Sequence, residues 1–239
     1  MSAGERPLII ACGALVSELR EVLSRNGLAD AVEVRYLPAN LHNRPEGIVP
    51  ALREHLDARG SRATFVGYAD CGTGGQIDTM LMDYPGVERI AGAHCYEFFA
   101  GSSLFHEVQD AEPGTFYLTD FLAKHFRALV WEGLGLDTHP QLRDAYFGNY
   151  SKVMYFSQVS DDSLIAIAKE AAEMLGLNFE HRHVGDRWRR RRAARWCELG
   201  DTCLRGVHVL QSLVHHARQR RWPLRCGLSC VRQGRTLAA

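Results

Sequence analysis

The sequence predicts an α/β protein with a mostly parallel, doubly wound, Rossmann-like sheet that has helices on both faces. Short apolar segments alternate along the chain with longer segments of helical periodicity, which is the pattern of strand–helix–strand units. The composition is 46% hydrophobic and 23% charged, as in ordinary globular proteins. No stretch of about 18 uninterrupted apolar residues occurs, so we expect no membrane-spanning segment.

Each element follows from the local spacing of apolar residues and from the residues that interrupt it. Strands are predicted where short apolar runs precede a turn, at residues 7–11, 32–37, 63–67, 88–93, 115–118, 152–156 and 179–184. Helices are predicted where apolar residues recur every three or four positions, at residues 14–25, 44–59, 76–83, 120–132, 140–147 and 161–175. Gly27 ends the first helix, Pro45 lies in the first turn of the second, and Gly176 ends the last.

The distribution of charge divides the chain near residue 185. Residues 1–185 carry 15 Lys and Arg against 25 Asp and Glu, whereas residues 186–239 carry 13 Arg and 3 acidic residues. The second segment is rich in Arg, Trp and Cys and contains no Ile, Met, Phe, Tyr, Lys or Asn. This composition favours a frameshifted or poorly structured tail, read from a GC-rich gene, over a tail that binds nucleic acid. We therefore expect one α/β domain over residues 1–185 and no nucleic-acid partner.

The predicted domain contains three cysteines, and each follows a predicted strand. Cys12 follows the first strand, Cys71 lies in the loop after the third, and Cys95 follows the fourth. A single cysteine in such a place is often just buried. Ligands of open parallel sheets bind at the carboxyl ends of the strands, however, so we expect the three thiols to converge there. Because Cys71 lies in a loop, we expect its sulfur to contribute little to core packing.

Three thiols that converge are suited to binding a metal. They could hold a [4Fe–4S] cluster with one open iron, or a zinc ion with one open position, and the sequence leaves this choice open. The polar side chains that flank these cysteines are candidate catalytic residues, and with zinc the flanking histidine could also serve as the fourth ligand. These residues are Asp70, His94 and Glu97.

Two further loops at the same predicted edge could bind a substrate. One follows the second strand and carries polar and cationic side chains, and the other is a glycine-rich turn before a helix, where backbone amides can bind an anion. An alternative is that these residues only cap a helix and form a tight turn. Residues 146–150 are rich in aromatic side chains that could form a pocket wall or only core. The predicted substrate-binding residues are His42, Asn43, Arg44, Thr73 and Gly74.

Several of these segments together resemble the bacterial and archaeal family called domain of unknown function 1638. The resemblance covers about residues 7–185 and rests on the strings ACGAL (11–15), LHNRPE (41–46), GYADCGTGG (67–75), HCYEFFAG (94–101) and YFGNY (146–150). The family has no settled activity. The resemblance implies an association with corrinoid-dependent methyltransferases of one-carbon metabolism. The sequence departs from the family after Gly185, which agrees with a frameshifted tail.

The sequence therefore predicts a cytoplasmic metal-binding enzyme with a three-cysteine site, a small-molecule substrate and a link to corrinoid methyltransferase proteins. The cytoplasm is expected because the start of the chain lacks the features of a signal peptide. A second hypothesis is a metal-free thiol enzyme in which two cysteines face each other across a cleft, as in aspartate/glutamate racemases. A third is a non-enzymatic protein that handles a cofactor for methyltransferases.

Overall fold

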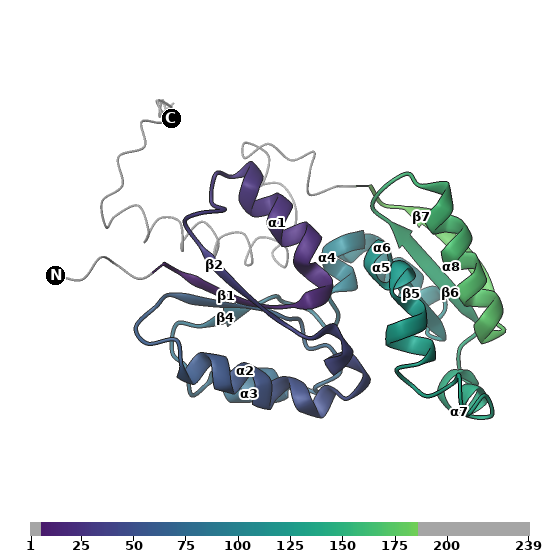
Figure 1. Cartoon of the computed structure of the whole chain (residues 1–239), viewed down its shortest axis with the longest axis horizontal. Coiled ribbons are helices and arrows are strands. Elements are labelled where there is room, and N and C mark those ends of the chain that lie inside the picture. Colours follow the sequence, from purple (N-terminus) through teal and green to yellow (C-terminus); the bar gives the residue numbers. More distant parts are fainter. Residues whose placement is uncertain (1–5, 186–239) are drawn as a thin grey trace, which may run out of the picture.

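A computed structural model describes residues 6–185 and places their strands in two parallel sheets (Figure 1). The first sheet has the order β2-β1-β3-β4. Its strands are β1 (Leu8–Cys12), β2 (Glu33–Leu37), β3 (Thr64–Gly67) and β4 (Glu88–Arg89). The central strand β1 is buried along its whole length, as expected for a strand with neighbours on both sides and helices on both faces.

The second sheet has the order β5-β6-β7 and is also parallel. Its strands are β5 (Thr115–Thr119), β6 (Lys152–Ser157) and β7 (Asn178–His183). The predicted α/β class and the parallel pairing are confirmed, but the strands form two sheets. The chain leaves the first sheet after β4, which is only two residues long, and β5 then pairs with β6 instead.

Helices cover both faces of the first sheet. Figure 1 shows α1 (Val16–Arg25) on one side and both α2 (Ile48–Asp57) and α3 (Gln76–Leu81) on the other. Two helices that the sequence analysis did not predict, α4 (Tyr96–Ala100) and α5 (Ser102–Ala111), follow β4 and lead to the second sheet. No helix of residues 6–185 is long and apolar enough to cross a membrane.

The second sheet is accompanied by α6 (Asp120–Lys124), α7 (Leu142–Phe147) and α8 (Asp162–Leu175). The helix predicted over residues 120–132 is divided in the structure, because α6 ends at Lys124 and a π-helix follows at Arg127–Trp131. The long helix α8 agrees with its prediction. The side chain of Asp161 caps its first turn, and Gly176 ends it in the left-handed conformation.

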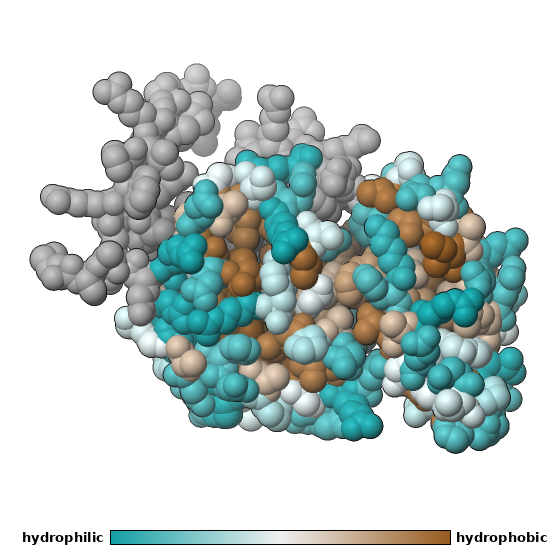
Figure 2. Space-filling view, viewed as in Figure 1, coloured by the Kyte–Doolittle hydropathy of each residue, from teal (hydrophilic) through white to brown (hydrophobic). Residues whose placement is uncertain are grey.

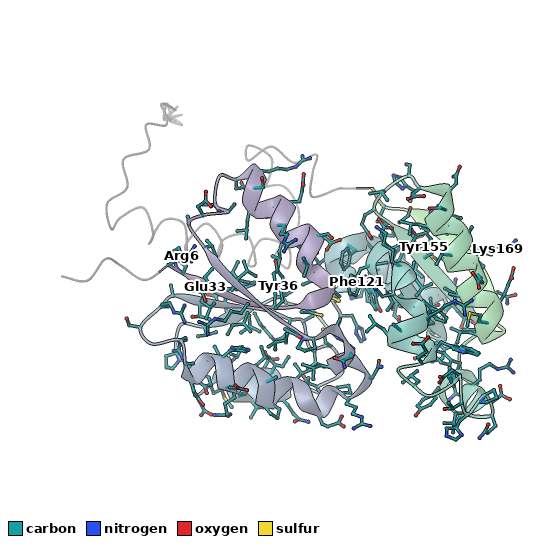
Figure 3. The ribbon with its side chains drawn as sticks, viewed as in Figure 1. Arg6, Glu33, Tyr36, Phe121, Tyr155 and Lys169 are labelled. Carbon is teal, nitrogen blue, oxygen red and sulfur yellow. The ribbon has the colours of Figure 1, made fainter. Side chains whose placement is uncertain are left out.

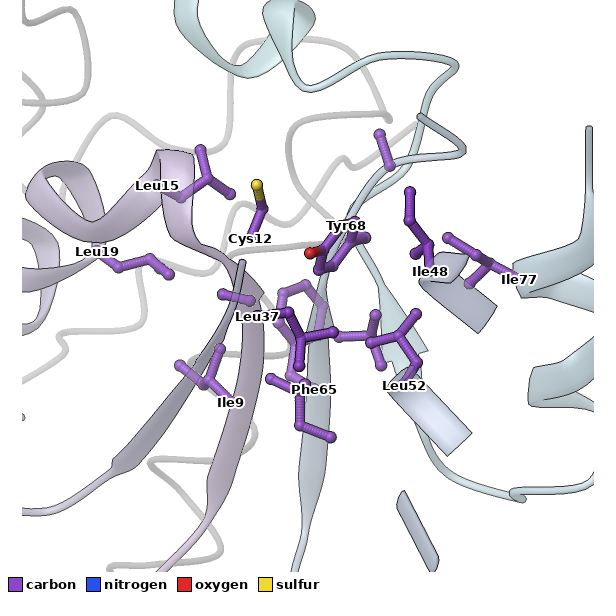
Figure 4. Packing of buried hydrophobic residues seen from close by; sticks show 14 of the residues in the cluster. Ile9, Cys12, Leu15, Leu19, Leu37, Ile48, Leu52, Phe65, Tyr68 and Ile77 are labelled. Carbon is purple, nitrogen blue, oxygen red and sulfur yellow. The ribbon is translucent and has the colours of Figure 1, made fainter. Parts of the chain in front are cut away.

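Each sheet has its own hydrophobic core. In the core of the first sheet, side chains from β1, β3, α2 and α3 pack together. Figure 4 shows Cys12 and Tyr68 at the end of this core, with the Tyr68 hydroxyl on the side of Cys12. Side chains from β6, α6 and α8 form the second. A third cluster joins Phe105 of α5 to Tyr117 and Phe156 of the second sheet, so α5 is packed against that sheet.

Gly67 lies where β3 passes close to β1, and we expect a side chain there to be poorly tolerated. A Cβ at Gly67 would lie 2.7 Å from the Cβ of Ala11, closer than real contacts allow. Gly67→Ala is expected to destabilise the fold by roughly 1–3 kcal/mol, because the two strands must separate locally. Urea unfolding would measure the loss.

Gly47→Ala provides a matched control because its Cβ would meet a flexible side chain, the methyl group of Leu41, at 3.3 Å. An equal loss of stability in the two variants would contradict the explanation by strand crowding.

Candidate functional site

The structure brings the three predicted cysteines to one edge of the first sheet. Cys12 is the last residue of β1, Cys71 follows β3 by one short loop, and Cys95 directly precedes α4. All three are free thiols. Cys12 and Cys71 are buried, whereas Cys95 is partly exposed. Cys71 is only 6% exposed and belongs to the first core cluster, so the expectation that its sulfur contributes little to packing is wrong.

The backbone at Cys71 is held in an unusual conformation. Its φ is 51°, and it is the only residue other than glycine with a positive φ among residues 6–185. The loop that contains it is fixed by Asp70, whose carboxylate accepts hydrogen bonds from the amide of Gly75 at 2.7 Å and the hydroxyl of Thr73 at 2.9 Å. The amide of Cys71 donates to the carbonyl of Ala93 at 2.9 Å. Such strained residues persist only where the surroundings hold them, and they are common at functional sites.

His42 lies between the thiols of Cys12 and Cys71. Its Nδ1 is 3.1 Å from the carbonyl oxygen of Ala39 and 3.8 Å from the Cys12 sulfur, and its ring stacks on Tyr68 with centroids 6.0 Å apart. Its Nε2 is buried and has no hydrogen-bond partner. Burial alone lowers the pKa of His42, but the neighbouring thiols of Cys12 and Cys71 raise it to about 10. His42 is therefore an imidazolium at neutral pH.

The thiols of Cys71 and Cys95 have opposite tendencies to ionise. A hydrogen bond from Cys95 lowers the pKa of Cys71 most strongly, and His42 lowers it further against the effect of burial, to about 5. The pKa of Cys95 is raised well above its usual value, first by Cys71 and then by burial. At neutral pH, Cys71 is a thiolate and Cys95 stays protonated. Adjacent groups whose pKa values are pushed apart are typical of acid–base pairs in active sites.

A cavity of about 560 Å³ lies beside these residues and is lined by residues from both halves of the protein. Cys71, Cys95 and His42 line it, whereas Cys12 does not. Residues between 109 and 150 form the opposite walls. Phe121, which is labelled in Figure 3, is one of these wall residues. Figure 2 shows the surface hollowed between the two halves, with hydrophobic residues on both sides. A volume of this size is typical of pockets for small molecules.

Only one of the three predicted catalytic side chains lines this cavity. His94 lines it, and its ring lies against Tyr96 and Phe105. The Glu97 carboxylate is 3.3 Å from the amide of Ala93 and does not line the cavity. Asp70 holds the loop around Cys71. Its pKa is lowered because hydrogen bonds from that loop outweigh burial, so its carboxylate is occupied as an acceptor. Their catalytic roles stay predictions.

Only two of the predicted substrate-binding residues reach the cavity. His42 and Asn43 line it, and the Asn43 side chain also donates to the carbonyl of Leu129 at 2.7 Å, which links the two halves. Arg44 is exposed and lies outside the lining. Thr73 and Gly74 also lie outside it, and both donate hydrogen bonds to Asp70.

The sequence analysis missed Tyr68 and most of the opposite wall. Tyr68 is fully buried, and its hydroxyl has no hydrogen-bond partner. The pKa of Tyr68 is raised, chiefly by burial and then by Cys12, so it stays neutral. Tyr68 lies in the string GYADCGTGG (67–75), three residues before Cys71, and this position could have indicated that it belongs to the site. The wall residues Phe116, Tyr117 and Phe121 gave no signal, because their role depends on how the second sheet meets the first.

The predicted metal centre needs ligands in a suitable arrangement. Within residues 6–185, no group of three or more His, Cys, Asp or Glu side chains is arranged to hold a metal ion. Electrostatic effects nevertheless connect the three thiols, because both Cys12 and Cys71 raise the pKa of Cys95. Metal binding at Cys12, Cys71 and Cys95 stays a prediction, as does the choice between iron–sulfur and zinc.

Comparison with known proteins gives one family. The sequence model of the family described as "Protein of unknown function (DUF1638)" matches residues 36–188, which is more than half of the chain. No curated protein and no solved structure matches the chain. The predicted corrinoid methyltransferase partners and the cytoplasmic location stay predictions. The predicted tail over residues 186–239 lies outside the described residues.

Proposed function

The chain belongs to the family of proteins of unknown function DUF1638, and we propose that it is an enzyme in which the Cys71 thiolate attacks a small organic substrate. One observation carries this proposal. Cys71 and His42 form a thiolate–imidazolium pair on the wall of a cavity large enough for a small molecule. A cysteine next to a cationic histidine is the usual form of an activated thiol nucleophile.

The low pKa favours a nucleophile over a base. A thiolate with a pKa of about 5 is a base roughly 3,000-fold weaker than an ordinary thiolate of pKa about 8.5. Its nucleophilicity falls much less, roughly 40-fold over the same range, because nucleophilicity depends on pKa with a slope of only about 0.4–0.5. At pH 7 this loss roughly offsets the gain of about 30-fold in the thiolate fraction, so the low pKa maintains the reactivity of Cys71 at neutral pH and increases it below pH 7. Removing a proton from carbon would gain little from such a weak base.

The positions of the cysteines also favour this mechanism over that of a racemase. Two cysteines that exchange protons on opposite faces of a carbon must lie on opposite walls. Cys71 and Cys95 instead lie close enough together to shift each other's pKa in opposite directions, and both line the cavity. In the proposed mechanism Cys71 forms the bond to carbon, and the protonated Cys95 supplies a proton to the group that gains electrons. His42 keeps Cys71 ionised before the substrate reacts.

The proposal is tested by selective alkylation with iodoacetamide at about pH 6. At this pH the thiolate fraction of Cys71 exceeds that of an ordinary thiol by roughly 300-fold, and its lower nucleophilicity reduces this advantage to roughly tenfold. Peptide mapping by mass spectrometry should therefore find Cys71 modified well ahead of Cys12 and Cys95. Equal modification of the three cysteines, or modification of Cys95 first, would exclude Cys71 as the activated nucleophile.

A second candidate function is the metal centre, in which Cys12, Cys71 and Cys95 bind an iron–sulfur cluster or zinc. Its support is that Cys12 and Cys71 both lie close enough to Cys95 to raise its pKa, and thiolates are the form that binds these metals. The side chains would have to move, since their present arrangement is not that of a ligand set. When bound, the metal would supply an open position for the substrate.

Cys12→Ser separates the two candidates because Cys12 does not line the cavity. Its sulfur accepts a hydrogen bond from the amide of Ala14 at 3.3 Å, which a serine hydroxyl can replace. Metal content should be measured on anaerobically purified wild type and Cys12→Ser. The metal candidate expects stoichiometric metal that the variant loses, with a brown colour if the metal is an iron–sulfur cluster. The nucleophile proposal expects unchanged selective alkylation of Cys71 in Cys12→Ser.

A further inference from the structure

The strand β7 of the second sheet carries two histidines that the proposed function does not use. Among the described strands, β7 pairs only with β6, so it forms an edge of the sheet. His181 and His183 occupy alternate positions of β7 and therefore point to the same face of the sheet. His181 is partly exposed and His183 is exposed, and neither lines the cavity beside Cys71. This pair is therefore separate from the site described above.

Both histidines meet one hydroxyl group at the end of β6. The Oγ atom of Ser157 is 2.8 Å from Nε2 of His181 and 2.9 Å from Nδ1 of His183. A hydroxyl group has one proton, so Ser157 donates to one ring and accepts a hydrogen bond from the other. One ring would be enough to satisfy the Ser157 proton, yet two imidazole nitrogens are aimed at the same point.

The ring of His181 is held in place by its neighbours. It stacks on Tyr155, with ring centroids 5.2 Å apart and an angle of 21° between the ring planes. The Tyr155 hydroxyl donates to the Asp120 carboxylate at 2.7 Å, which fixes the tyrosine in turn. His183 is exposed at the last position of β7, so its ring can shift toward His181. One ring thus offers a fixed nitrogen, and the other can adapt to a ligand.

We propose that His181 and His183 bind a divalent transition-metal ion of the kind that imidazole prefers, such as Zn²⁺. Imidazole nitrogen suits Zn²⁺, Cu²⁺ and Ni²⁺, whereas Mg²⁺ and Ca²⁺ prefer oxygen ligands. The two nitrogens that would bind the ion are Nε2 of His181 and Nδ1 of His183, because these already point at one place. This site goes beyond the function proposed for Cys71 and does not depend on it.

The local geometry needs only a small change to accept the ion. Zinc–nitrogen bonds are about 2.0–2.1 Å long, so two hydrogen bonds through Ser157 would be replaced by shorter bonds to the metal. The exposed His183 ring supplies the necessary shift, and the Ser157 oxygen becomes a neutral third ligand. Within residues 6–185 no third His, Cys, Asp or Glu is arranged to complete the site. Water therefore fills the remaining position, and the site is open.

Calorimetric titration of the full chain with Zn²⁺ tests the site at about pH 7.5, where an ordinary imidazole is neutral and free to bind a metal. His183→Ala and His181→Ala should each bind about one Zn²⁺ fewer per chain than wild type, because a single imidazole holds the ion too weakly. Zinc bound by the thiols would remain in both variants, so the difference counts only the histidine site. His183 is exposed, and its replacement should leave the fold intact.

His106→Ala is the matched control. His106 is also exposed, and its Nδ1 also lies against a protein oxygen, the carbonyl of Ser102, at 2.8 Å. This variant should bind as much Zn²⁺ as wild type. Ser157→Ala keeps both imidazoles and should weaken binding several-fold without abolishing it. Diethyl pyrocarbonate, which modifies accessible imidazoles, gives a local readout by peptide mapping: Zn²⁺ should protect His183 several-fold and should leave His106 unprotected.

Three results would overturn the proposal. Wild type could bind no more Zn²⁺ than His183→Ala, His106→Ala could lose as much zinc as His183→Ala, or Zn²⁺ could leave the modification of His183 unchanged. An unchanged affinity in Ser157→Ala would remove Ser157 from the ligands. Selective alkylation of Cys71 should be the same in wild type and His183→Ala, because the two sites lie at different sheets.

Discussion

Alkylation of Cys71 should already reach its maximal rate at neutral pH and should fall to half of that rate near pH 5. The reason is that Cys95 and His42 together hold the pKa of Cys71 at about 5, against burial, which raises it. Only the thiolate reacts, so the rate increases with pH through this pKa and is constant above it. An ordinary thiol would instead gain reactivity up to about pH 8–9. Stopped-flow or quenched alkylation followed by peptide mapping gives the profile.

Two substitutions should move this profile upward in pH. Cys95→Ala removes the hydrogen bond that lowers the pKa of Cys71 most strongly, and His42→Asn removes the cation beside it. Burial remains in both variants and continues to raise the pKa. At about pH 6, each variant should therefore alkylate at Cys71 several-fold more slowly than wild type.

Cys95→Ser is the matched control, because a serine hydroxyl keeps a hydrogen-bond donor toward Cys71. Its profile should stay closer to wild type than that of Cys95→Ala. If all three variants keep the half-maximal rate near pH 5, neither Cys95 nor His42 is responsible for the ionisation of Cys71. The pairing on which the proposed function rests would then be wrong.

The convergence of the cysteines could be predicted because it follows from a general property of parallel sheets. Strands that run in the same direction bring their carboxyl ends to one edge, so Cys12, Cys71 and Cys95 meet although they are far apart in sequence. The division into two sheets could not be predicted in this way. It depends on β5 pairing with β6 and not with β4, which local apolar patterns do not specify.

The electrostatics of the site also depended on tertiary contacts. The loop after β2 was predicted to lie at the correct edge, but the position of His42 between two thiols depends on the Ala39 carbonyl and the Tyr68 ring. The opposite roles of Cys71 and Cys95 arise from their contact with each other. Part of the aromatic wall was anticipated, because Tyr146, Phe147 and Tyr150 lie in the segment expected to form a pocket wall or core. Phe116, Tyr117 and Phe121 were missed because residues 109–150 approach the first sheet only in the assembled fold.

Asp120→Ala should cause a large loss of stability in the second half of the protein. Asp120 lies at the end of β5 and is 8% exposed. Its carboxylate accepts hydrogen bonds from the hydroxyl of Tyr155 at 2.7 Å, the amide of Gln158 at 3.1 Å and the amide of Val159 at 3.0 Å. Alanine leaves three largely buried donors without this acceptor. We expect a loss of roughly 3–5 kcal/mol, or about 10 °C in melting temperature.

Asp161→Ala is the matched control for this prediction. Asp161 also accepts a backbone hydrogen bond, from the amide of Ser163 at 2.9 Å, but it caps the exposed start of α8, where water can replace it. Its loss should cost only about 1 kcal/mol. Urea and thermal unfolding of both variants measure the difference, since the same residue type is removed in each. A cost for Asp120→Ala no larger than that for Asp161→Ala would mean that Asp120 does not join the ends of β5 and β6, and that another interaction holds this edge of the sheet.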